Sequence, residues 1–329
     1  MKKLLAPIAA SLAILLAATA CGSGEYAATE IPPKVQPSEA PAAPPATQPD
    51  CGNALASYAP EGTMPAPGAM PTGTYMAKIQ QRGRLIAGVS ADSLNLGARD
   101  PVTGQIQGFD IDMIYAVADA IFGKPAPGQP HKVELRVISS PQRIPVLQKE
   151  QVDIVARNMT INCSRWAQIA FSAEYYRSGQ KTLVPIDSTA KSLKDLDGKT
   201  ICAPAGSTSL DNLKKENPQA VPITADTDTG CLALFQSGKA YGITGDDTVL
   251  AGDVAQDPYA KVLDDRISNE PYGLGMSLKR SEFVRFVNQV LDQMKTSGAW
   301  MISYNKWLKP ALGELKAPPP SVYGRIPAQ

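Results

Sequence analysis

Arg165 lies in a stretch whose residue types could bind a small anion. Residues 152–156 (VDIVA) have the apolar pattern of a buried strand, and Thr160 and Asn162 follow before a helix-like turn around Arg165. Backbone N–H groups at the start of a helix are unpaired, and a guanidinium offers two parallel donors that match a carboxylate. The stretch therefore predicts a carboxylate site. An arginine on a solvated helix face is the simpler alternative.

The overall composition argues against several other kinds of site. The chain has 329 residues, enough for one large or two medium domains that each bury a core. Its net charge of +1 indicates no polyanionic partner such as nucleic acid. The single histidine, His131, argues against a His-based metal site or a Ser–His–Asp triad. We therefore expect neither a metal nor a cofactor.

Residues 1–21 are typical of an export signal. Two lysines precede an apolar run that ends in small residues before Cys21. The ending Ala18-Thr19-Ala20-Cys21 resembles a bacterial lipobox, in which the cysteine is diacylated and becomes the new N-terminus. We expect an exported lipoprotein, anchored through Cys21 to the outer face of the cytoplasmic membrane. An ordinary signal peptide cut nearby is the alternative.

Two proline-rich segments flank the remainder of the chain. Residues 22–74 are rich in Pro, Ala, Ser and Thr and show no hydrophobic periodicity, which predicts an extended, mostly disordered tether. Residues 311–329 form a second proline-rich segment, expected to be a C-terminal tail. The folded body therefore spans about residues 75–310.

The folded body alternates predicted strands and helices. Strands are expected at 84–89, 132–138, 152–156, 182–185, 200–203, 241–244 and 272–278. Helices are expected at 76–81, 109–121, 144–147, 192–197, 231–237, 282–296 and 299–308, and from residues 208 and 247 onward. Repeated βα units favour an α/β fold, with parallel sheets covered by helices on both faces. Ligands on such sheets bind beyond the carboxyl ends of the strands.

The segment Gly108-Phe109-Asp110-Ile111-Asp112-Met113, followed by Val117, Ala118 and Ile121, resembles a known signature. It is similar to that of the family 3 extracellular solute-binding proteins, the polar amino-acid receptors of ABC importers. Further landmarks of the family occur in the same order at residues 151–155, 159–172, 193–199 and 298–307. Among subgroups, the chain looks most like actinobacterial, particularly mycobacterial, glutamate/glutamine-binding lipoproteins.

The resemblance implies a two-lobe periplasmic-binding-protein fold of type II that closes on one amino acid. Two hinge strands would join the lobes, near residues 180–185 and 270–275. Lobe 1 would then comprise residues 75–179 and 276–310, and lobe 2 residues 180–275. We expect a monomer.

In lobe 1, the resemblance assigns the ligand's α-carboxylate to Arg165, helped by the hydroxyl and backbone of Thr160. Asn158 lies where backbone groups of the family meet the ligand. Asp92 falls where the first loop often places a ligand-facing acid. The aromatic residue usual a few positions later is replaced by Ser93-Leu94-Asn95-Leu96, of which Leu96 is the expected ligand contact, and a second aromatic is absent near Ser140. These departures predict a pocket rich in polar groups.

In lobe 2, the turn that contains Ser207 and Thr208 would present N–H groups to the carboxylate from the opposite side. Thr208 could also cap the helix that follows. Asp246, near the end of a predicted strand, resembles the acid that pairs with the α-ammonium group. Asp247 is the alternative if the register shifts by one residue.

Arg157 directly follows the buried strand and is expected to point into the same cleft as Arg165. A second guanidinium there favours a ligand with a second carboxylate. We therefore predict L-aspartate or L-glutamate ahead of asparagine or glutamine. The alternative is that Arg157 pairs with an acid of the protein, such as Asp92.

The cysteines other than Cys21 are expected to form disulfides, because an exported protein meets an oxidising compartment. Four cysteines allow three pairings. A bond between the lobes would block closure of the hinge, which favours Cys202–Cys231 within lobe 2. Cys51–Cys163 then remains and would pin the tether onto lobe 1 beside the binding loop.

The expected partners are a free amino acid and either an ABC permease or a membrane sensor protein. Both uses need the same closed, liganded form, so the sequence does not separate them. A few members of the family are dehydratases that act on amino-acid-like substrates. Asp92 or Asp246 could be proposed as the general acid of such an enzyme, but each has a simpler role in binding. We therefore expect a receptor and not an enzyme.

Overall fold

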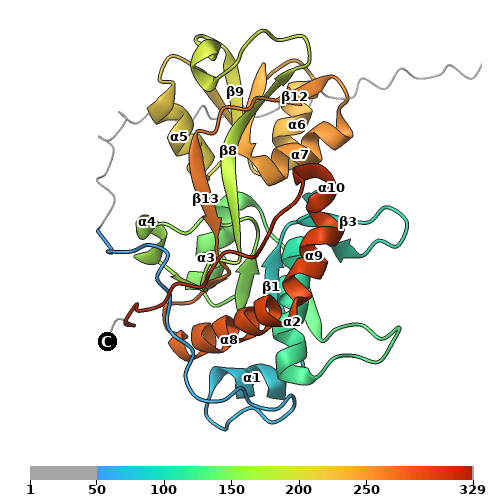
Figure 1. Cartoon of the computed structure of the whole chain (residues 1–329), viewed down its shortest axis with the longest axis vertical. Helices are drawn as coiled ribbons and strands as arrows, with labels where there is room; N and C mark the ends of the chain where they lie inside the picture. The colour runs from blue at the N-terminus through green and yellow to red at the C-terminus, as the bar shows by residue number, and fades with distance from the viewer. Residues whose placement is uncertain (1–49, 328–329) are drawn as a thin grey trace, which may run out of the picture. The chain divides into compact units, whose positions relative to one another are not determined.

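The computed structural model describes residues 50–327, which fold into two lobes of strands and helices (Figure 1). In lobe 1 the five-stranded sheet has the order β5-β1-β6-β14-β7. Strands β1, β5 and β6 are parallel, and β14 is antiparallel to both β6 and β7. The bounds of these strands are Leu85–Val89 (β1), Val133–Val137 (β5), Ile154–Ala156 (β6), Ala170–Phe171 (β7) and Gly275–Met276 (β14).

The larger sheet, of six strands, belongs to lobe 2. Its order is β10-β9-β11-β8-β12, and β13 also pairs with β8. The strands are Tyr176–Pro185 (β8), Thr200–Pro204 (β9), Val221–Ala225 (β10), Gly242–Asp246 (β11), Ala260–Val262 (β12) and Ser268–Tyr272 (β13). The sequence did not predict β10. This strand pairs only with β9, contains a proline and buries none of its residues fully, so it carries little apolar pattern.

Helices flank both sheets, as expected for repeated βα units. They are Tyr75–Arg82 (α1), Phe109–Phe122 (α2), Arg143–Gln148 (α3), Cys163–Trp166 (α4), Thr208–Glu216 (α5), Asp228–Gln236 (α6), Asp247–Gln256 (α7), Ser281–Ser297 (α8), Ala299–Trp307 (α9) and Lys309–Leu312 (α10). Short 3₁₀ turns occur at Ser140–Gln142 and Leu193–Leu196, and the loop after β1 contains the small sheet Asp92–Ser93 (β2), Gly97–Arg99 (β3) and Ile106–Gln107 (β4). None of the helices in residues 50–327 is both long and apolar enough to cross a membrane.

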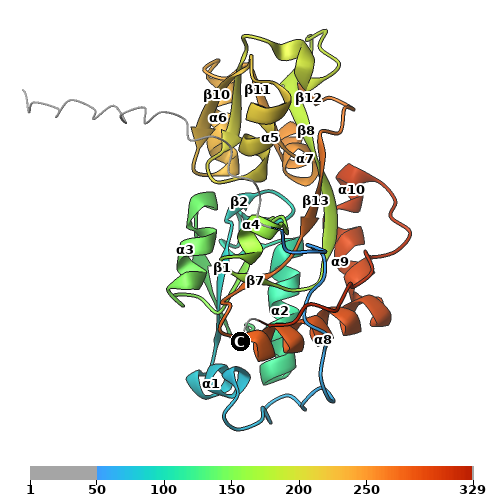
Figure 2. The ribbon, with the colours of Figure 1, turned by 90° about the vertical axis from the view of Figure 1, so that its left-hand side faces the viewer.

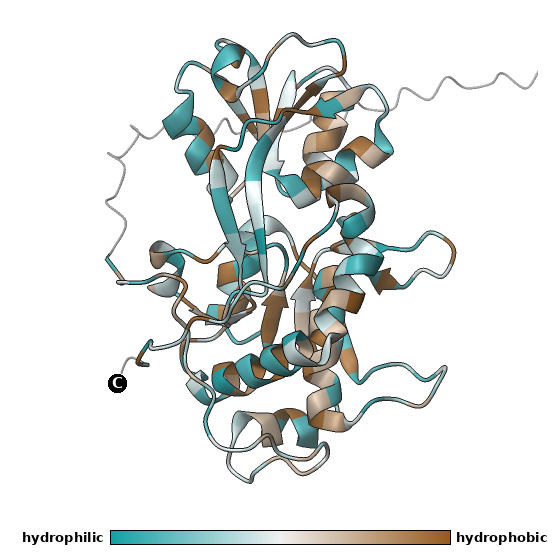
Figure 3. Ribbon diagram, in the orientation of Figure 1, coloured by the Kyte–Doolittle hydropathy of each residue, from teal (hydrophilic) through white to brown (hydrophobic). Residues whose placement is uncertain are grey.

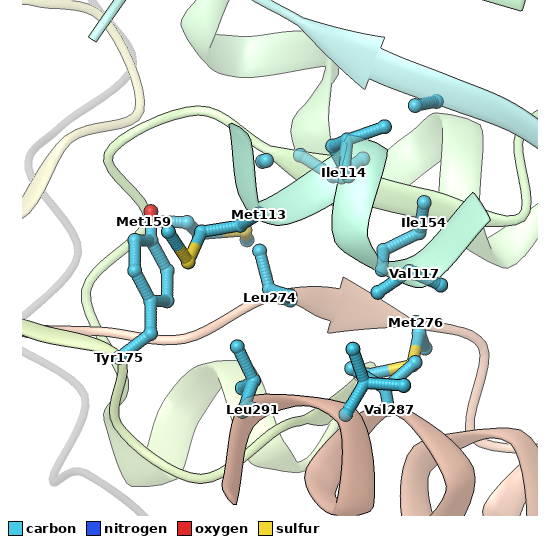
Figure 4. Packing of buried hydrophobic residues seen from close by; sticks show 14 of the residues in the cluster. Met113, Ile114, Val117, Ile154, Met159, Tyr175, Leu274, Met276, Val287 and Leu291 are labelled. Atoms are coloured by element: carbon cyan, nitrogen blue, oxygen red, sulfur yellow. The ribbon is translucent and has the colours of Figure 1, made fainter. Parts of the chain in front are cut away.

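The hydrophobic core of lobe 1 fixes where its strands end. Figure 4 shows side chains of α2, β6, β14 and α8 meeting in one cluster, among them Ile114, Ile154, Met276 and Leu291. All four are fully buried. In α2 and α8 the buried positions recur every three or four residues, which is the apolar stripe that attaches a helix to a core.

Two strands, β8 and β13, carry the chain between the lobes. They are antiparallel neighbours, with Tyr176 opposite Tyr272 and Gln180 opposite Ser268, and Figures 1 and 2 show them side by side. Both are mostly hydrophilic (Figure 3), although several of their polar side chains are buried. The single strand expected at 272–278 is split at Gly273, where the chain enters lobe 1. A Cβ atom there would lie 2.8 Å from Ile161 Cγ1, so a larger residue would clash.

The N-terminal part of the described chain differs from the extended tether expected for residues 22–74. Within residues 50–74, Ser57, Tyr58 and Met70 are buried. The physical reason is a set of long-range contacts that the sequence pattern does not reveal, including hydrogen bonds from Asn288 of α8 to Ser57 Oγ and Tyr58 O. The expected signal segment, the lipidation site Cys21 and the remainder of the tether lie outside the described residues.

The proline-rich segment after residue 310 also packs on lobe 1. Tyr323 forms a parallel β-bridge with Ser57, so the two ends of the described chain lie side by side. Both expected disulfides are present. The Cys51–Cys163 and Cys202–Cys231 bonds have S–S distances of 1.98 and 2.06 Å.

Candidate ligand-binding site

A pocket lies where the two lobes face each other. Both lobes contribute polar and charged side chains to its lining. Lobe 1 contributes Ser140, Arg143, Asn158, Thr160 and Arg165 to the lining. The residues from lobe 2 include Ser207, Thr208, Asp228, Asp246 and Asp253. Most of these residues follow a strand or begin a helix, so the loops at the carboxyl ends of the strands build the pocket.

Arg165 projects from α4 into the pocket and is buried. Asn162 is the N-cap of this helix, and its side-chain oxygen accepts the Arg165 backbone N–H at 2.9 Å. The guanidinium donates to the carbonyl of Thr160 at 2.7 Å and, weakly, to that of Gly206 in lobe 2 at 3.4 Å. Burial lowers the pKa of Arg165, and the charges of Glu270 and Asp246 oppose that shift.

Arg143 is a second buried guanidinium in the lining, and the sequence interpretation missed it. It begins α3, and its three guanidinium nitrogens donate only to carbonyls, including Ser140 O at 2.9 Å and Gly206 O at 3.2 Å. Burial and the neighbouring charge of Arg165 hold the pKa of Arg143 well below its usual range. Its position at the start of a helix after a strand, like that of Arg165, was the signal available in the sequence.

Neither Arg143 nor Arg165 forms an ion pair with a carboxylate anywhere in residues 50–327. Burying a cation without a counter-charge is costly, so such groups are normally paired. Two unpaired guanidiniums in one pocket therefore favour an anionic ligand.

Asp246 ends β11 and precedes α7, and it is buried in the pocket lining. Its Oδ2 accepts the Tyr272 hydroxyl at 2.7 Å, whereas its Oδ1 is buried without a partner among the described residues. Burial and the charge of Glu270 raise its pKa well above the usual range. Asp247 lies outside the lining, where it accepts the Ser178 hydroxyl and faces Arg266. Of the two candidates, only Asp246 can meet a ligand in this pocket.

Thr160 and Thr208 both line the pocket, and both hydroxyls donate to Glu270 of the hinge strand β13, at 2.6 and 2.7 Å. Glu270 therefore connects the lobes behind the pocket, a role that sequence reasoning missed. The expected cap of α5 also differs by one residue. Ser207 is the N-cap and accepts the Leu210 N–H at 3.2 Å, because the capping residue precedes the first helical residue, Thr208.

Asn158 lies in the lining with a left-handed backbone, φ 36°, a conformation that asparagine tolerates better than most residues. Its N–H donates to Asp110 Oδ2 at 2.9 Å, and its own side-chain oxygen is buried without a partner in the described chain. Burial raises the pKa of Asp110 to about 6.

Three predicted contacts do not line the pocket. Arg157 lies behind Ser140, only 1% exposed, with its Nη2 at 3.8 Å from Asp92 and 3.9 Å from Asp228. The geometry thus matches the alternative in which Arg157 pairs with acids of the protein. Asp92 accepts the N–H and hydroxyl of Thr229 in lobe 2, so it bridges the lobes instead of facing the pocket. Leu96 is buried in the lobe 1 core and is absent from the pocket lining.

Asp253 of α7 is a further acid in the lining that the sequence interpretation missed. It is 3% exposed, and its Oδ2 is buried with no hydrogen-bond partner among the described residues. Burial and the negative charges of Asp228 and Asp92 raise its pKa to about 8. Within residues 50–327 these acids do not form a cluster of the kind that holds a metal ion.

The pocket can therefore complement a small ligand of mixed charge. Lobe 1 offers two guanidiniums for anionic groups, and lobe 2 offers the free oxygen of Asp246 for a cationic group. Direct contacts between the lobes accompany this arrangement, including the Ser140 N–H to Asp226 O at 3.0 Å. A ligand held from both sides would stabilise the closed arrangement of the lobes.

Comparisons with known proteins identify the family of the chain. Residues 85–310 match the model of the bacterial extracellular solute-binding proteins, family 3. The chain is 35% identical over 211 residues to a glutamine-binding protein of Geobacillus stearothermophilus, a match that covers 64% of this chain and 79% of the relative. It is 28% identical over 260 residues to the glutamate-binding protein GluB of Corynebacterium efficiens, with 77% and 86% covered.

Solved structures share the fold. The ancestral amino acid-binding protein AncCDT-1, described as a precursor of cyclohexadienyl dehydratase, is 31% identical, with a TM-score of 0.65. The match covers 72% of this chain and all of that one. The family and the relatives are receptors, and the two-lobe fold with two hinge strands is theirs. The chain belongs to the bacterial extracellular solute-binding proteins of family 3, and it is a receptor rather than an enzyme.

Proposed function

We propose that this receptor binds a dicarboxylic amino acid, L-glutamate or L-aspartate, between its lobes. The observation that carries the proposal is the pair of buried guanidiniums, Arg143 and Arg165, which line one pocket without a carboxylate partner in the described chain. An amino acid with two carboxylates offers each guanidinium a charge-assisted partner.

The binding mode follows from the positions of the charged groups. Arg165 would bind the α-carboxylate, with the N-terminus of α5 at Ser207 and Thr208 on the opposite side of the pocket. The free Oδ1 of Asp246 would accept the α-ammonium group. Arg143 would bind the carboxylate of the ligand side chain, the role that the sequence alone suggested for Arg157.

The amides L-glutamine and L-asparagine form a second class of candidate ligands. Asp253 and Asn158 each place a buried, unpartnered oxygen at the lining, and such an oxygen could accept an amide N–H of the ligand. The name of one relative includes both classes of ligand: a protein at 33% identity is named as a glutamate/glutamine/aspartate/asparagine-binding protein.

The partner proposed for the closed, liganded form is an ABC permease or a membrane sensor protein. A relative at 29% identity is named as an ABC transporter glutamine-binding protein, which supports the first of these. We also propose that the mature protein is a monomer, held at the outer face of the cytoplasmic membrane through a lipid on Cys21.

Calorimetric titration of the ligand-free protein tests the proposed ligand class. The protein is unfolded, dialysed and refolded to remove any bound amino acid, then titrated with L-glutamate, L-aspartate, L-glutamine, L-asparagine and L-arginine. We expect the tightest binding for L-glutamate or L-aspartate, weaker binding for the amides, and none for L-arginine, whose side chain would oppose Arg143. Tighter binding of an amide or of L-arginine would contradict the proposal.

A further inference from the structure

Helix α4 carries Arg165 but has only four residues, Cys163–Trp166. Isolated helices this short are not stable, so contacts with the remainder of the protein must decide where α4 lies. The Arg165 side chain faces the pocket. Two other residues of α4, Cys163 and Trp166, contact the two ends of the described chain instead.

The N-terminal end contacts α4 at three points. Cys51 is joined to Cys163 by a disulfide. The carbonyl of Ala54 accepts the indole N–H of Trp166 at 2.8 Å. The ring of Tyr58 meets the Trp166 ring edge to face, with the centroids 5.8 Å apart.

The C-terminal end covers the same tryptophan. The guanidinium carbon of Arg325 lies 4.0 Å from the centroid of the Trp166 ring, within the range of a cation–π contact. The same guanidinium donates to the carbonyls of Ala56 and Asn53, at 2.8 and 3.0 Å. Arg325 therefore ties the two chain ends to each other as well as to α4.

Helix α8 forms hydrogen bonds with both chain ends. Asn288 donates to Ser57 Oγ at 2.9 Å, while Asp292 accepts the hydroxyls of Ser321 and Tyr323, each at 2.6 Å. Since α8 belongs to the lobe 1 core, these bonds give the chain ends a fixed support. We call residues 51–58 and 321–325 together the terminal clasp.

We propose that the terminal clasp is a positioning device for Arg165, so that affinity for the amino acid depends on the Cys51–Cys163 disulfide and on Arg325. The inference rests on the proposed role of Arg165 in binding the α-carboxylate. Both parts of the clasp lie outside residues 85–310, the range that matches the family model. The device is thus built from parts of this chain that the match to the family does not cover.

The clasp acts on the ligand only through α4. Binding sites need their side chains held to within a fraction of an ångström, and a guanidinium at the end of a flexible side chain depends on its backbone for that. Loss of the clasp leaves the four residues of α4 with the Asn162 cap, the packing of Trp166 on Phe171 and the pocket contacts. We expect α4 to move more, and Arg165 to meet the carboxylate less often in the right geometry.

The test compares variants of the full mature protein in titrations with L-glutamate and L-glutamine at 25 °C. The clasp variants are the double variant Cys51→Ser/Cys163→Ser and the single variant Arg325→Ala. The matched control is Arg280→Ala, because Arg280 stacks on the ring of Tyr75 at 4.4 Å elsewhere in lobe 1. Hydrogen exchange of the peptide that contains residues 163–166 is measured in parallel.

We expect the clasp variants to raise Kd by roughly tenfold and to speed exchange in α4, since small misplacements of a binding group are costly. Arg280→Ala should change neither quantity, even if it lowers the melting temperature. An unchanged Kd in the clasp variants, or a raised Kd with unchanged exchange in α4, would overturn the inference. Arg165→Ala separates the two proposals. If that variant keeps the wild-type Kd, the role of Arg165 fails; if it weakens binding while the clasp variants do not, only the clasp fails.

Discussion

Replacing Arg143 by methionine should convert a receptor for acidic amino acids into one with little preference between acids and amides. Methionine keeps much of the volume of the buried side chain but removes its charge and donors. In the proposed complex the lost contact is a hydrogen-bonded ion pair for L-glutamate, and for L-glutamine a hydrogen bond from the charged guanidinium to a neutral amide oxygen. The two ligands should therefore lose different amounts of binding free energy.

The size of the difference follows from typical hydrogen-bond energies. Truncating one partner of a buried, hydrogen-bonded charge pair costs about 2–5 kcal/mol, and a hydrogen bond between a charged and a neutral group contributes about 1.5–3 kcal/mol. With a factor of ten for each 1.4 kcal/mol, Kd should rise roughly 30- to 4,000-fold for L-glutamate and roughly 10- to 150-fold for L-glutamine. The ratio of the two dissociation constants should then shift by about tenfold towards the amide.

Isothermal titration of the refolded protein with each ligand measures that ratio directly. The control is Arg136→Met, because Arg136 is exposed on β5 and pairs with Glu134 away from the pocket. The reasoning would be refuted if Arg143→Met weakened both ligands by the same factor. That result would mean that Arg143 supports the pocket through its bonds to carbonyls and does not meet the ligand side chain.

Three other substitutions test the charged groups in and behind the pocket. The pKa of Asp253 is raised to about 8 in the folded protein, above the value near 3.8 expected for the unfolded chain. Between these two pH values the folded state binds more protons than the unfolded state, so the protein loses stability as the pH rises. Asp253→Asn should remove that loss, so its gain in melting temperature over the wild type should grow from pH 4 to pH 8; a gain independent of pH would contradict the assignment. Asp246→Asn should weaken the binding of every amino acid by at least about 30-fold, since it removes the partner of a buried charge. The binding of 2-oxoglutarate, which has no ammonium group, should weaken much less. Equal losses for both kinds of ligand in titration would exclude the ammonium role. Arg157→Ala should destabilise the fold by about 3 kcal/mol, because it leaves the buried Asp228 and the half-buried Asp92 without their cation. It should leave the preference for L-glutamate over L-glutamine intact; a selective loss of acidic ligands with unchanged denaturant stability would restore Arg157 as a ligand contact.

The secondary structure was largely predictable where one face of an element is apolar. Helix α2 was expected at 109–121 and spans Phe109–Phe122, and the long helix α8 was expected at 282–296 and spans Ser281–Ser297. Both have buried residues at helical spacing. The edge strand β10 and the polar hinge strand β13 lack such a pattern. Their positions depend on hydrogen-bond pairing with β9 and β8 and not on the burial of an apolar face.

The pocket was only partly predictable. Arg165 and Asp246 were found because each stands at a strand or helix end within a recognisable motif, and both line the pocket. Arg157 also follows a strand directly, yet its side chain turns behind Ser140 towards Asp92 and Asp228. The spacing along the chain places a residue at the edge of a sheet, but the packing of neighbouring loops decides which way its side chain points.

The sequence alone determined most of the elements, the family and the strand ends at which a carboxylate could be held, and the lobes implied by the family favoured the disulfide pairs. These depend on apolar periodicity, on residue types and on short spacings, all of which can be seen in the linear chain. Only the tertiary structure decided that Arg143 and Asp253 belong to the pocket, that Glu270 links the lobes, and that both chain ends pack on α4. Each of these facts needs residues from distant parts of the chain to meet, and that meeting is set by the close packing of the folded lobes.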